Sequence, residues 1–252
     1  MVITFDTTLL ISYNSITMIT ERQKGILDGI IGEYIDSAQP VSSQLVEKRY
    51  GFGICPATIR IEMQKLTETG YLCQPHTSAG RIPTDKGYRF FVNNLLEKGI
   101  NDFENIPEIQ KIVEREREDT VKFIWRLAKF LSDASSELAT VYLFEKDCFW
   151  KEGWEEVLLK PEFNEKNFVI NFTNLLENFG ERAANLKLMP GIRIYIGKEN
   201  PFPNARDFSI ISSKCRLPEE GEAIFALLGP KRMDYDRNIS LLHSLIKVLE
   251  EF

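Results

Sequence analysis

The sequence predicts an α+β protein of two domains, in which a helical first domain precedes a second domain of mixed helices and strands. Apolar residues with helical spacing dominate the first hundred residues. Strand-like apolar runs recur after residue 140. Between the two parts lies a short polar stretch with glycine, asparagine and proline, a composition typical of linkers. We therefore expect a first domain at residues 18–99, a linker at 100–107 and a second domain at 108–252.

Two short helices are expected at the start of the first domain. Residues 20–36 show an apolar stripe of period 3.6, and Thr20 and Gln23 have the spacing of a capping box. A second helix begins after Ser42, whose side chain can cap it, and ends at Gly51, a residue type that often closes helices. A polar turn that ends in proline separates the two helices.

A third helix, a hairpin and a fourth helix follow. Pro56 is suited to the first position of a helix because its missing N–H has no partner there, and Gly70 closes this helix. The polar segment Gln74–Thr84 has the turn residues of a hairpin, in which we expect Gly80 to adopt positive φ. The fourth helix covers residues 84–97. This order of elements is that of a winged helix, a fold that reads DNA with its third helix.

The second domain is expected to combine a sheet with long helices. We expect one amphipathic helix from Glu108 to about Leu138, a helix at residues 166–179 and a last helix that ends at Glu251. The strand-like runs are Val141–Phe144, Ile192–Ile196, Phe208–Ser212 and Ala223–Leu228. Their order along the chain predicts a small α/β or α+β domain with a partly antiparallel sheet.

Composition argues against several classes of protein. The net charge is −6, but the first domain has ten lysine and arginine residues against nine acidic ones, so it is the part suited to a polyanion. Four scattered cysteines and two histidines argue against disulfides and a zinc site. No apolar stretch is long enough to cross a membrane, and a secretory signal is not evident. We expect a cytoplasmic protein without cofactor or metal.

The outer face of the third helix carries residue types that read DNA. Three residues have the spacing to face the core, namely Ile59, Met63 and Leu66. Arg60, Gln64 and Lys65 lie on or beside the opposite face and can reach base edges or phosphates. The alternative is an ordinary solvated helix face, because charged outer faces are common.

The hairpin segment favours DNA binding over that alternative. Thr77, Ser78 and the backbone N–H groups can hold phosphate oxygens, and Arg81 can enter the adjacent minor groove. His76 has no second histidine or cysteine nearby, so we expect neither a metal site nor a catalytic role there. The residues that we expect to contact DNA are Ser42, Thr58, Arg60, Ile61, Gln64, Lys65, His76, Thr77, Ser78, Arg81, Lys86 and Arg89.

Several runs of the sequence resemble the family of the heat-inducible transcription repressor HrcA. The run from Gln74 to Phe90, QPHTSAGRIPTDKGYRF, is long and highly specific. Further similar runs lie at residues 57–60, 70–72, 153–163, 194–201 and 228–235. The resemblance spans nearly the whole chain from Met18.

The resemblance implies a winged helix followed by a GAF-like α/β domain. It also implies a homodimer that binds an inverted-repeat operator in double-stranded DNA upstream of chaperone genes and represses them outside heat stress. Loss of the active fold on heating would release the repressor, and the chaperonin would be the partner that helps to maintain that fold. No enzymatic activity is implied.

Three features depart from the family pattern. Ile61 stands where the family usually has asparagine, so it can touch a thymine methyl group but cannot pair with adenine through two hydrogen bonds. The segment after Val141–Phe144 is short where the family carries a long inserted dimerisation segment, so we expect a shortened GAF-like domain. Residues Met1 to Thr17 have no counterpart, and we interpret them as an extension from an upstream start codon, with Met18 as the natural start.

A second possible function is that of a winged-helix regulator whose GAF-like domain senses a small metabolite. The run at residues 228–235 would then be part of a ligand site. We favour a structural role for this run, in which Asp234 or Asp236 caps the last helix.

An enzyme is the third possibility, with the carboxylate pairs Glu155/Glu156 or Glu219/Glu220 as the reacting groups. Adjacent residues on a helix or strand do not face one another, and no base or metal motif accompanies either pair. We therefore do not expect catalysis.

Overall fold

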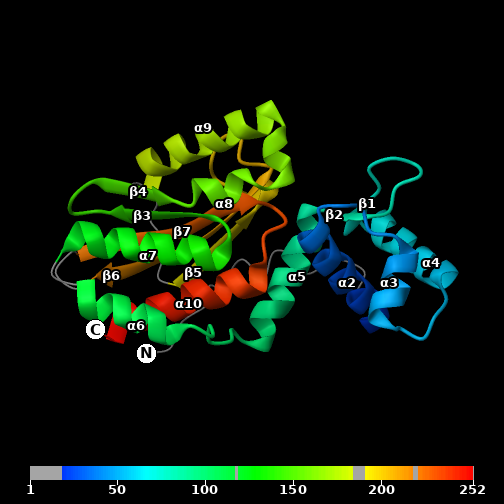
Figure 1. Ribbon diagram of the computed structural model, residues 1–252. Coiled ribbons are helices and arrows are strands. Elements are labelled where there is room, and N and C mark those ends of the chain that lie inside the picture. Colours follow the sequence, from blue (N-terminus) through cyan, green and yellow to red (C-terminus); the bar gives the residue numbers. More distant parts are fainter. Residues whose placement is uncertain (1–18, 117–118, 184–190, 218–220, 252) are drawn as a thin grey trace. The chain divides into compact units, whose positions relative to one another are not determined.

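The computed structural model describes residues 19–116, 119–183, 191–217 and 221–251 of the chain (Figure 1). The chain divides between Lys98 and Gly99 into two compact units. Within the described residues, the first unit consists of helices and a short hairpin, and the second is built on a five-stranded sheet. The expected extension, Met1 to Thr17, lies outside the described residues.

The first unit is a winged helix. Its elements are α2 (Glu21–Ser37), α3 (Ser43–Tyr50), α4 (Pro56–Glu68), β1 (Leu72–Cys73), β2 (Ile82–Pro83) and α5 (Asp85–Lys98). The predicted helix caps are confirmed, because Thr20 Oγ1 accepts a hydrogen bond from the Gln23 N–H and Ser42 Oγ accepts one from the Leu45 N–H, both at 3.2 Å. The core between the helices includes Ile30, Val46, Ile59, Leu66, Tyr88 and Val92.

A third extended segment joins the hairpin of β1 and β2. The backbones of Val41 and Arg81 exchange two hydrogen bonds, each of 2.9 Å. Gly80 lies beside this bridge, and a Cβ atom at Gly80 would overlap the carbonyl group of Val41. The predicted positive φ at Gly80 is wrong, since its backbone is not in the left-handed region. Glycine is needed there because two backbone segments approach closely.

The second unit is built on an antiparallel sheet with the strand order β4-β3-β7-β6-β5. The strands are β3 (Leu138–Leu143), β4 (Cys148–Glu152), β5 (Gly191–Ile196), β6 (Phe208–Leu217) and β7 (Gly221–Pro230). All pairings of these strands are antiparallel, so the prediction of a partly antiparallel sheet is correct only in part. The sequence analysis did not predict β4, which is an edge strand with only partly buried side chains.

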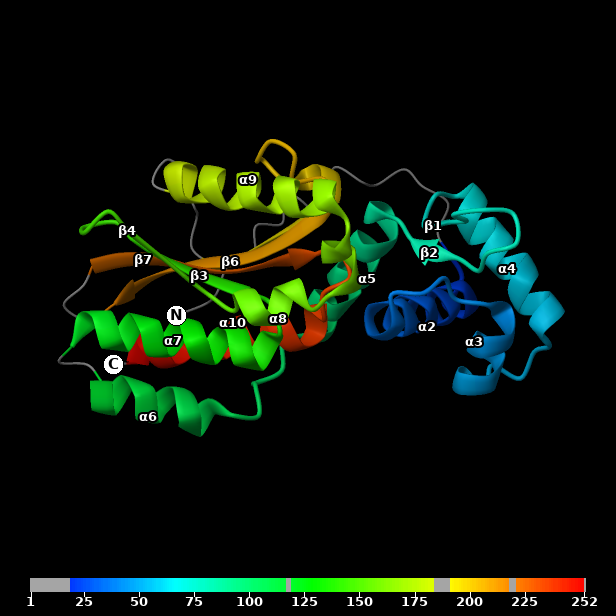
Figure 2. The ribbon, with the colours of Figure 1, turned by 45° about the horizontal axis from the view of Figure 1, so that its top comes forward.

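Helices cover both faces of the sheet. On one face lies α9 (Lys166–Ala183), and on the other lie α7 (Thr120–Ser135) and α10 (Tyr235–Glu251), with α6 (Ile106–Glu116) packed against both of these (Figure 2). The short helix α8 (Trp154–Leu158) and the 3₁₀ helix η1 (Pro161–Asn164) lead from β4 to α9, and the 3₁₀ helix η2 (Gly197–Glu199) lies between β5 and β6. The order of layers is therefore helix, sheet and helices.

The single long helix predicted from Glu108 to about Leu138 is wrong. The structure has α6 and α7 in its place, and Leu138 is the first residue of β3. Asp119 Oδ1 accepts a hydrogen bond from the Lys122 N–H at 3.1 Å and so caps the start of α7. The predicted cap of the last helix is confirmed, because Asp234 Oδ1 accepts from the Arg237 N–H at 3.1 Å.

Part of the predicted linker packs against the second unit. The Phe103 N–H donates to Ser244 Oγ at 2.8 Å, and Lys247 Nζ lies 3.3 Å from a carboxylate oxygen of Asp102. Because α6 already begins at Ile106, the stretch without such contacts is shorter than residues 100–107.

Aromatic residues fill the space between α9 and the sheet. The ring centroid of Phe172, in α9, lies 4.9 Å from that of Phe163 and 5.2 Å from that of Phe208. All three side chains are buried. Close aromatic pairs of this kind add specific contacts to the burial of apolar surface, so they hold α9 on the sheet.

Charged residues from two of the family-like runs meet in the second unit. Arg232 Nη2 donates to Glu162 Oε2 at 3.0 Å. Lys160 forms an ion pair with Glu137, and the absence of a side chain at Gly229 leaves room for this carboxylate. Burial raises the pKa of Glu137 to about 7, and the Lys160 ammonium opposes this shift. The two runs therefore carry a structural cluster that joins η1 to the end of β7.

Candidate nucleic-acid interface

Helix α4 turns its apolar residues inward, as its spacing predicts. Ile59, Met63 and Leu66 are buried against the other helices of the first unit. The opposite face exposes Arg60, Ile61, Gln64 and Lys65. Ile61 is 57% exposed, so its apolar side chain is accessible on this face. A continuous exposed face of polar residues with one apolar residue is thus available on α4.

The start of α4 is open to solvent. Pro56 is its first residue, and the preceding Cys55 makes no side-chain cap to the helix backbone. The exposed Sγ atom of Cys55 lies 3.3 Å from Thr58 Oγ1, and this hydrogen bond lowers the pKa of the thiol. Thr58 lies at the end of α4 where the backbone N–H groups have no intrahelical acceptor, and this end of a helix favours an anion.

The loop of the wing is a compact turn with exposed polar tips. Gln74 Nε2 donates to the carbonyl oxygens of Thr77 and Ala79, at 2.8 and 3.0 Å. His76, Thr77 and Ser78 are exposed, and Ser78 Oγ lies 3.3 Å from His76 Nδ1. The role of Gln74 was not predicted, because no residue pattern shows that its amide donates to two carbonyl oxygens of the same loop.

Arg81 lies against α4 and does not extend from the wing. Its Nε atom donates to Thr67 Oγ1 and its Nη2 atom donates to Gln64 Oε1, both at 3.1 Å. Its position in the structure therefore differs from the minor-groove position that the sequence suggests. Arg81 links the wing to the centre of α4.

Lys86 turns toward the end of α4 and not toward the exposed face. Its Nζ atom donates to the Thr69 carbonyl oxygen at 2.7 Å and lies 4.2 Å from the centroid of the Tyr71 ring. Partial burial lowers the pKa of Lys86. A cation at this position stabilises the C-terminal end of α4 through the helix dipole. Arg89, on the same helix α5, is partly exposed.

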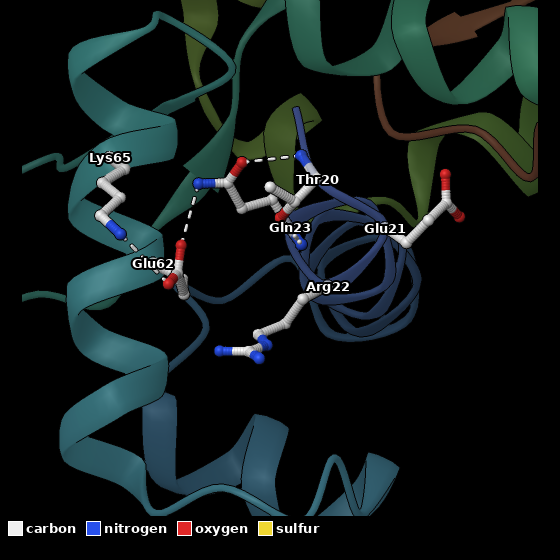
Figure 3. A pocket seen from close by; sticks show the side chains of 6 residues that line it. All are labelled: Thr20, Glu21, Arg22, Gln23, Glu62 and Lys65. Atoms are coloured by element: carbon white, nitrogen blue, oxygen red, sulfur yellow. Dashed lines mark hydrogen bonds and ion pairs between the residues drawn. The ribbon is translucent and has the colours of Figure 1, made fainter. Parts of the chain in front are cut away.

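A hollow of about 410 Å³ lies between the start of α2 and α4 (Figure 3). It is lined by Thr20, Glu21, Arg22, Gln23, Glu62 and Lys65. The buried Glu62 accepts a hydrogen bond from Gln23 Nε2 at 2.9 Å and forms an ion pair with Lys65 Nζ at 3.2 Å. Gln23, which belongs to the capping box of α2, thereby positions the Glu62 carboxylate, and this carboxylate orients Lys65.

The supporting role of Glu62 was not predicted from the sequence. Its partner Gln23 lies 39 positions earlier in the chain, so no local pattern could show that the two side chains meet. Ser42, which the analysis counted among the DNA contacts, uses its hydroxyl oxygen as the cap of α3 and remains exposed.

The described residues offer little support for other kinds of site. Within them, no group of three or more histidine, cysteine or acidic residues is placed to hold a metal ion. None of the described helices combines the length and the apolar character needed to cross a bilayer. Of the carboxylate pairs considered for catalysis, Glu155 contacts Lys129 at 3.4 Å, and Glu219 and Glu220 lie outside the described residues.

The sequence is similar to curated repressors over most of its length. It is 25% identical to the heat-inducible transcription repressor HrcA of Thermodesulfovibrio yellowstonii, with 92% of this chain and 97% of the relative covered. It is 28% identical to the protein of the same name from Thermoanaerobacter pseudethanolicus, with 91% and 95% covered. The first alignment runs over 344 positions, more than the 252 residues of this chain, so the relative has residues that this chain lacks.

A solved structure shares the fold. A crystal structure described as that of a hypothetical protein matches with a TM-score of 0.75 and 21% identity, and covers 93% of this chain and 98% of its own. In addition, the family model for the HrcA protein C-terminal domain matches residues 88–239, which is more than half of the chain. The winged helix, the second unit and these matches agree with the resemblance of the sequence runs, and the chain belongs to the HrcA family.

Proposed function

We propose that this protein is a repressor of heat-shock genes that binds an inverted-repeat operator in double-stranded DNA. The observation that carries the proposal is the exposed face of α4, on which Arg60, Ile61, Gln64 and Lys65 lie beside the wing. The curated relatives, which are named heat-inducible transcription repressors, support it.

In this proposal, α4 enters the major groove, whose width admits one helix. Ile61 and Gln64, near the middle of the exposed face, meet base edges, while Arg60 and Lys65 reach phosphates on either side. The exposed hydroxyl groups of the wing bind the neighbouring backbone. The phosphate contacts set the register of the helix, and the base contacts select the sequence.

The proposed repressor acts in the cytoplasm as a homodimer. Each chain carries one α4, which reads one half of an inverted repeat, so a two-fold operator needs two chains. The bound dimer blocks transcription sterically, heating releases it through loss of the active fold, and the chaperonin helps to restore that fold. These steps rest on the family resemblance.

Gel-shift titrations at several fixed salt concentrations test the DNA contacts, with a duplex that the wild-type protein selects from a random pool. Arg60→Ala and Lys65→Ala should each weaken binding and make the salt dependence less steep by roughly one ion per lost phosphate contact. Lys111→Ala is the control, because it removes the same charge from an exposed position in α6 of the second unit. Unchanged binding by both α4 variants would falsify the assignment of this face.

A further inference from the structure

Gln64 is held in a single orientation by charged neighbours on both sides. We propose that this arrangement makes Gln64 a reader of adenine in the major groove, and that Arg81 and Glu68 are its positioning residues. The inference rests on the proposed function and adds the base that is read and the residues that prepare the reader. It also gives Arg81 a role other than a direct contact in the minor groove.

The contacts of Gln64 use both ends of its amide. The Oε1 atom accepts a hydrogen bond from Arg81 Nη2, and the Nε2 atom donates one to Glu68 Oε1, each at 3.1 Å. Gln64 and Glu68 are exposed and lie one helical turn apart on α4. The amide therefore lies across the outer face of α4 between a cation from the wing and a carboxylate from the helix.

Arg81 is itself fixed by the fold. Its backbone is paired with Val41 through two hydrogen bonds of 2.9 Å, and its Nε atom donates to Thr67 Oγ1. That hydroxyl in turn donates to the Met63 carbonyl oxygen at 2.8 Å. The guanidinium group thus reaches Gln64 from a backbone that is anchored to the wing.

The two neighbours of Gln64 determine which amide atom is the oxygen and which is the nitrogen. A guanidinium group has only donors, so the atom of Gln64 that faces it must be the oxygen. An ionised carboxylate has only acceptors, so the atom that faces Glu68 must be the nitrogen. Reversal of the amide would break both hydrogen bonds at once.

The remaining hydrogen-bonding capacity of the amide matches adenine. A carboxamide has two N–H groups and two lone pairs on oxygen. After one of each is used by Glu68 and Arg81, one donor and one acceptor remain. Adenine presents an acceptor, N7, and a donor, N6–H, on its major-groove edge. Because the side chain is ordered before DNA binds, less conformational freedom is lost on binding.

The test compares affinities for a series of duplexes in which each base pair of the selected site is replaced in turn. Wild-type protein should prefer adenine at one position by roughly tenfold or more, and Gln64→Ala should remove this preference. Arg81→Ala and Arg81→Lys should both reduce it at the same position, since a lysine lacks the planar fork that reaches two acceptors. The Arg81→Ala, Gln64→Ala double variant should lose no more of the preference than Gln64→Ala alone.

Glu68→Gln provides a separate variant that leaves Arg81 in place. It removes a negative charge from the DNA-binding face, so overall affinity should rise. The preference for adenine at that position should fall only in part, because Arg81 still orients the Gln64 oxygen while a glutamine at position 68 can present either amide atom to the Gln64 nitrogen. A purely electrostatic role of Glu68 would raise the affinity and keep the preference. Thermal unfolding of each variant checks that the fold is retained.

Three results would overturn the inference. The first is that Arg81→Ala weakens binding evenly at all positions and reduces the salt slope by about one, which is the behaviour of a phosphate contact. The second is that the preference for adenine is unchanged in both Arg81→Ala and Glu68→Gln. A wild-type protein that selects no sequence from the pool would remove the proposed function as well, whereas the first two results leave it intact.

Discussion

Ile61 is an exposed apolar side chain at the centre of the face that we assign to DNA. It is 57% exposed in the free protein, and the exposure of its apolar surface to water is unfavourable. Contact between Ile61 and the methyl group of a thymine would remove apolar surface of both groups from water. An asparagine, which the family usually has here, would instead form hydrogen bonds, so this residue is expected to change which base is preferred.

We predict that wild-type protein distinguishes thymine from uracil at one position of each half-site. Replacement of thymidine by deoxyuridine there removes one methyl group and should weaken binding by about 0.8 kcal/mol, or roughly fourfold. Ile61→Ala and Ile61→Asn should bind the two duplexes equally well. Fluorescence anisotropy titrations measure the difference. Equal binding of wild-type protein to the full set of singly substituted duplexes would show that Ile61 does not touch a thymine methyl.

The residue type of Lys86 does not indicate which groups its side chain contacts. Its charge and its place after the wing favour a DNA contact, yet its ammonium group donates to the last turn of α4 and lies over Tyr71. The partner, the Thr69 carbonyl oxygen, lies 17 positions earlier in the chain. Spacing within α5 contains no information about that partner.

At the scale of elements, the wing and α4 are joined by the segment around Gly80. The bridge between Val41 and Arg81 brings the wing to the turn before α3, and Arg81 then reaches α4. A glycine is required because a Cβ atom would overlap the Val41 carbonyl group. The position of the wing relative to α4 therefore depends on one residue without a side chain.

Gly80→Ala should lower the free energy of unfolding of the protein by about 1–3 kcal/mol, because backbone must shift to admit the new methyl group. Gly32→Ala is the matched control. Gly32 lies within α2, where an added Cβ would meet only the Tyr50 hydroxyl at an ordinary 3.4 Å, so the same substitution should be neutral or stabilise by up to about 1 kcal/mol. Urea unfolding followed by circular dichroism compares the two. Equal effects of both substitutions would contradict the close approach at Gly80.

The second unit shows where element prediction fails. Helices α6 and α7 have a common apolar period, which predicts one long helix. Asp119 starts the second helix, and Ser136, with φ of 57°, ends it before β3. Caps of this kind are weak local signals. Helices α6 and α7 pack against each other and against α10, an arrangement that one continuous straight helix cannot adopt.

At the scale of the whole molecule, the protein is shorter than its relatives. The alignment with the Thermodesulfovibrio yellowstonii repressor is longer than this chain, so that relative has residues that this chain lacks, while the place of the missing insert after β3 stays a prediction. Several apolar side chains nevertheless remain exposed on the second unit, namely Val121, Trp125, Leu158 and Leu159. The first two lie on α7, and Lys129 of this helix lies 3.4 Å from Glu155 of α8.

We predict that two chains bind one full inverted repeat even without the insert, because each chain would contribute its α4 to one half of the repeat. Sedimentation equilibrium with a labelled duplex should give two protein chains per duplex at saturation. A duplex with one half-site serves as the control and should bind one chain with much lower affinity. Saturation at one chain per full repeat would rule out the dimer.

The sequence alone determined the features that depend on near neighbours. The helices of the first unit, their caps at Thr20 and Ser42 and the exposed face of α4 all follow from spacings of three or four residues, because one turn of helix fixes which side chains share a face. The wing motif likewise identified the family. These features belong to local geometry, which a short window of residues contains.

Only the tertiary structure decided how the polar side chains of the face are paired. Arg81 meets Gln64 across 17 positions, and Gln23 meets Glu62 across 39. Glu137 and Lys160, in the second unit, are joined in the same way. A charged side chain takes the partner that the fold brings within reach, and for a buried group such as Glu137 a partner is needed to offset the cost of burial. Hence the spacing of residues in the sequence indicated which face of α4 is exposed, and the fold determined which side chains near it are paired with one another.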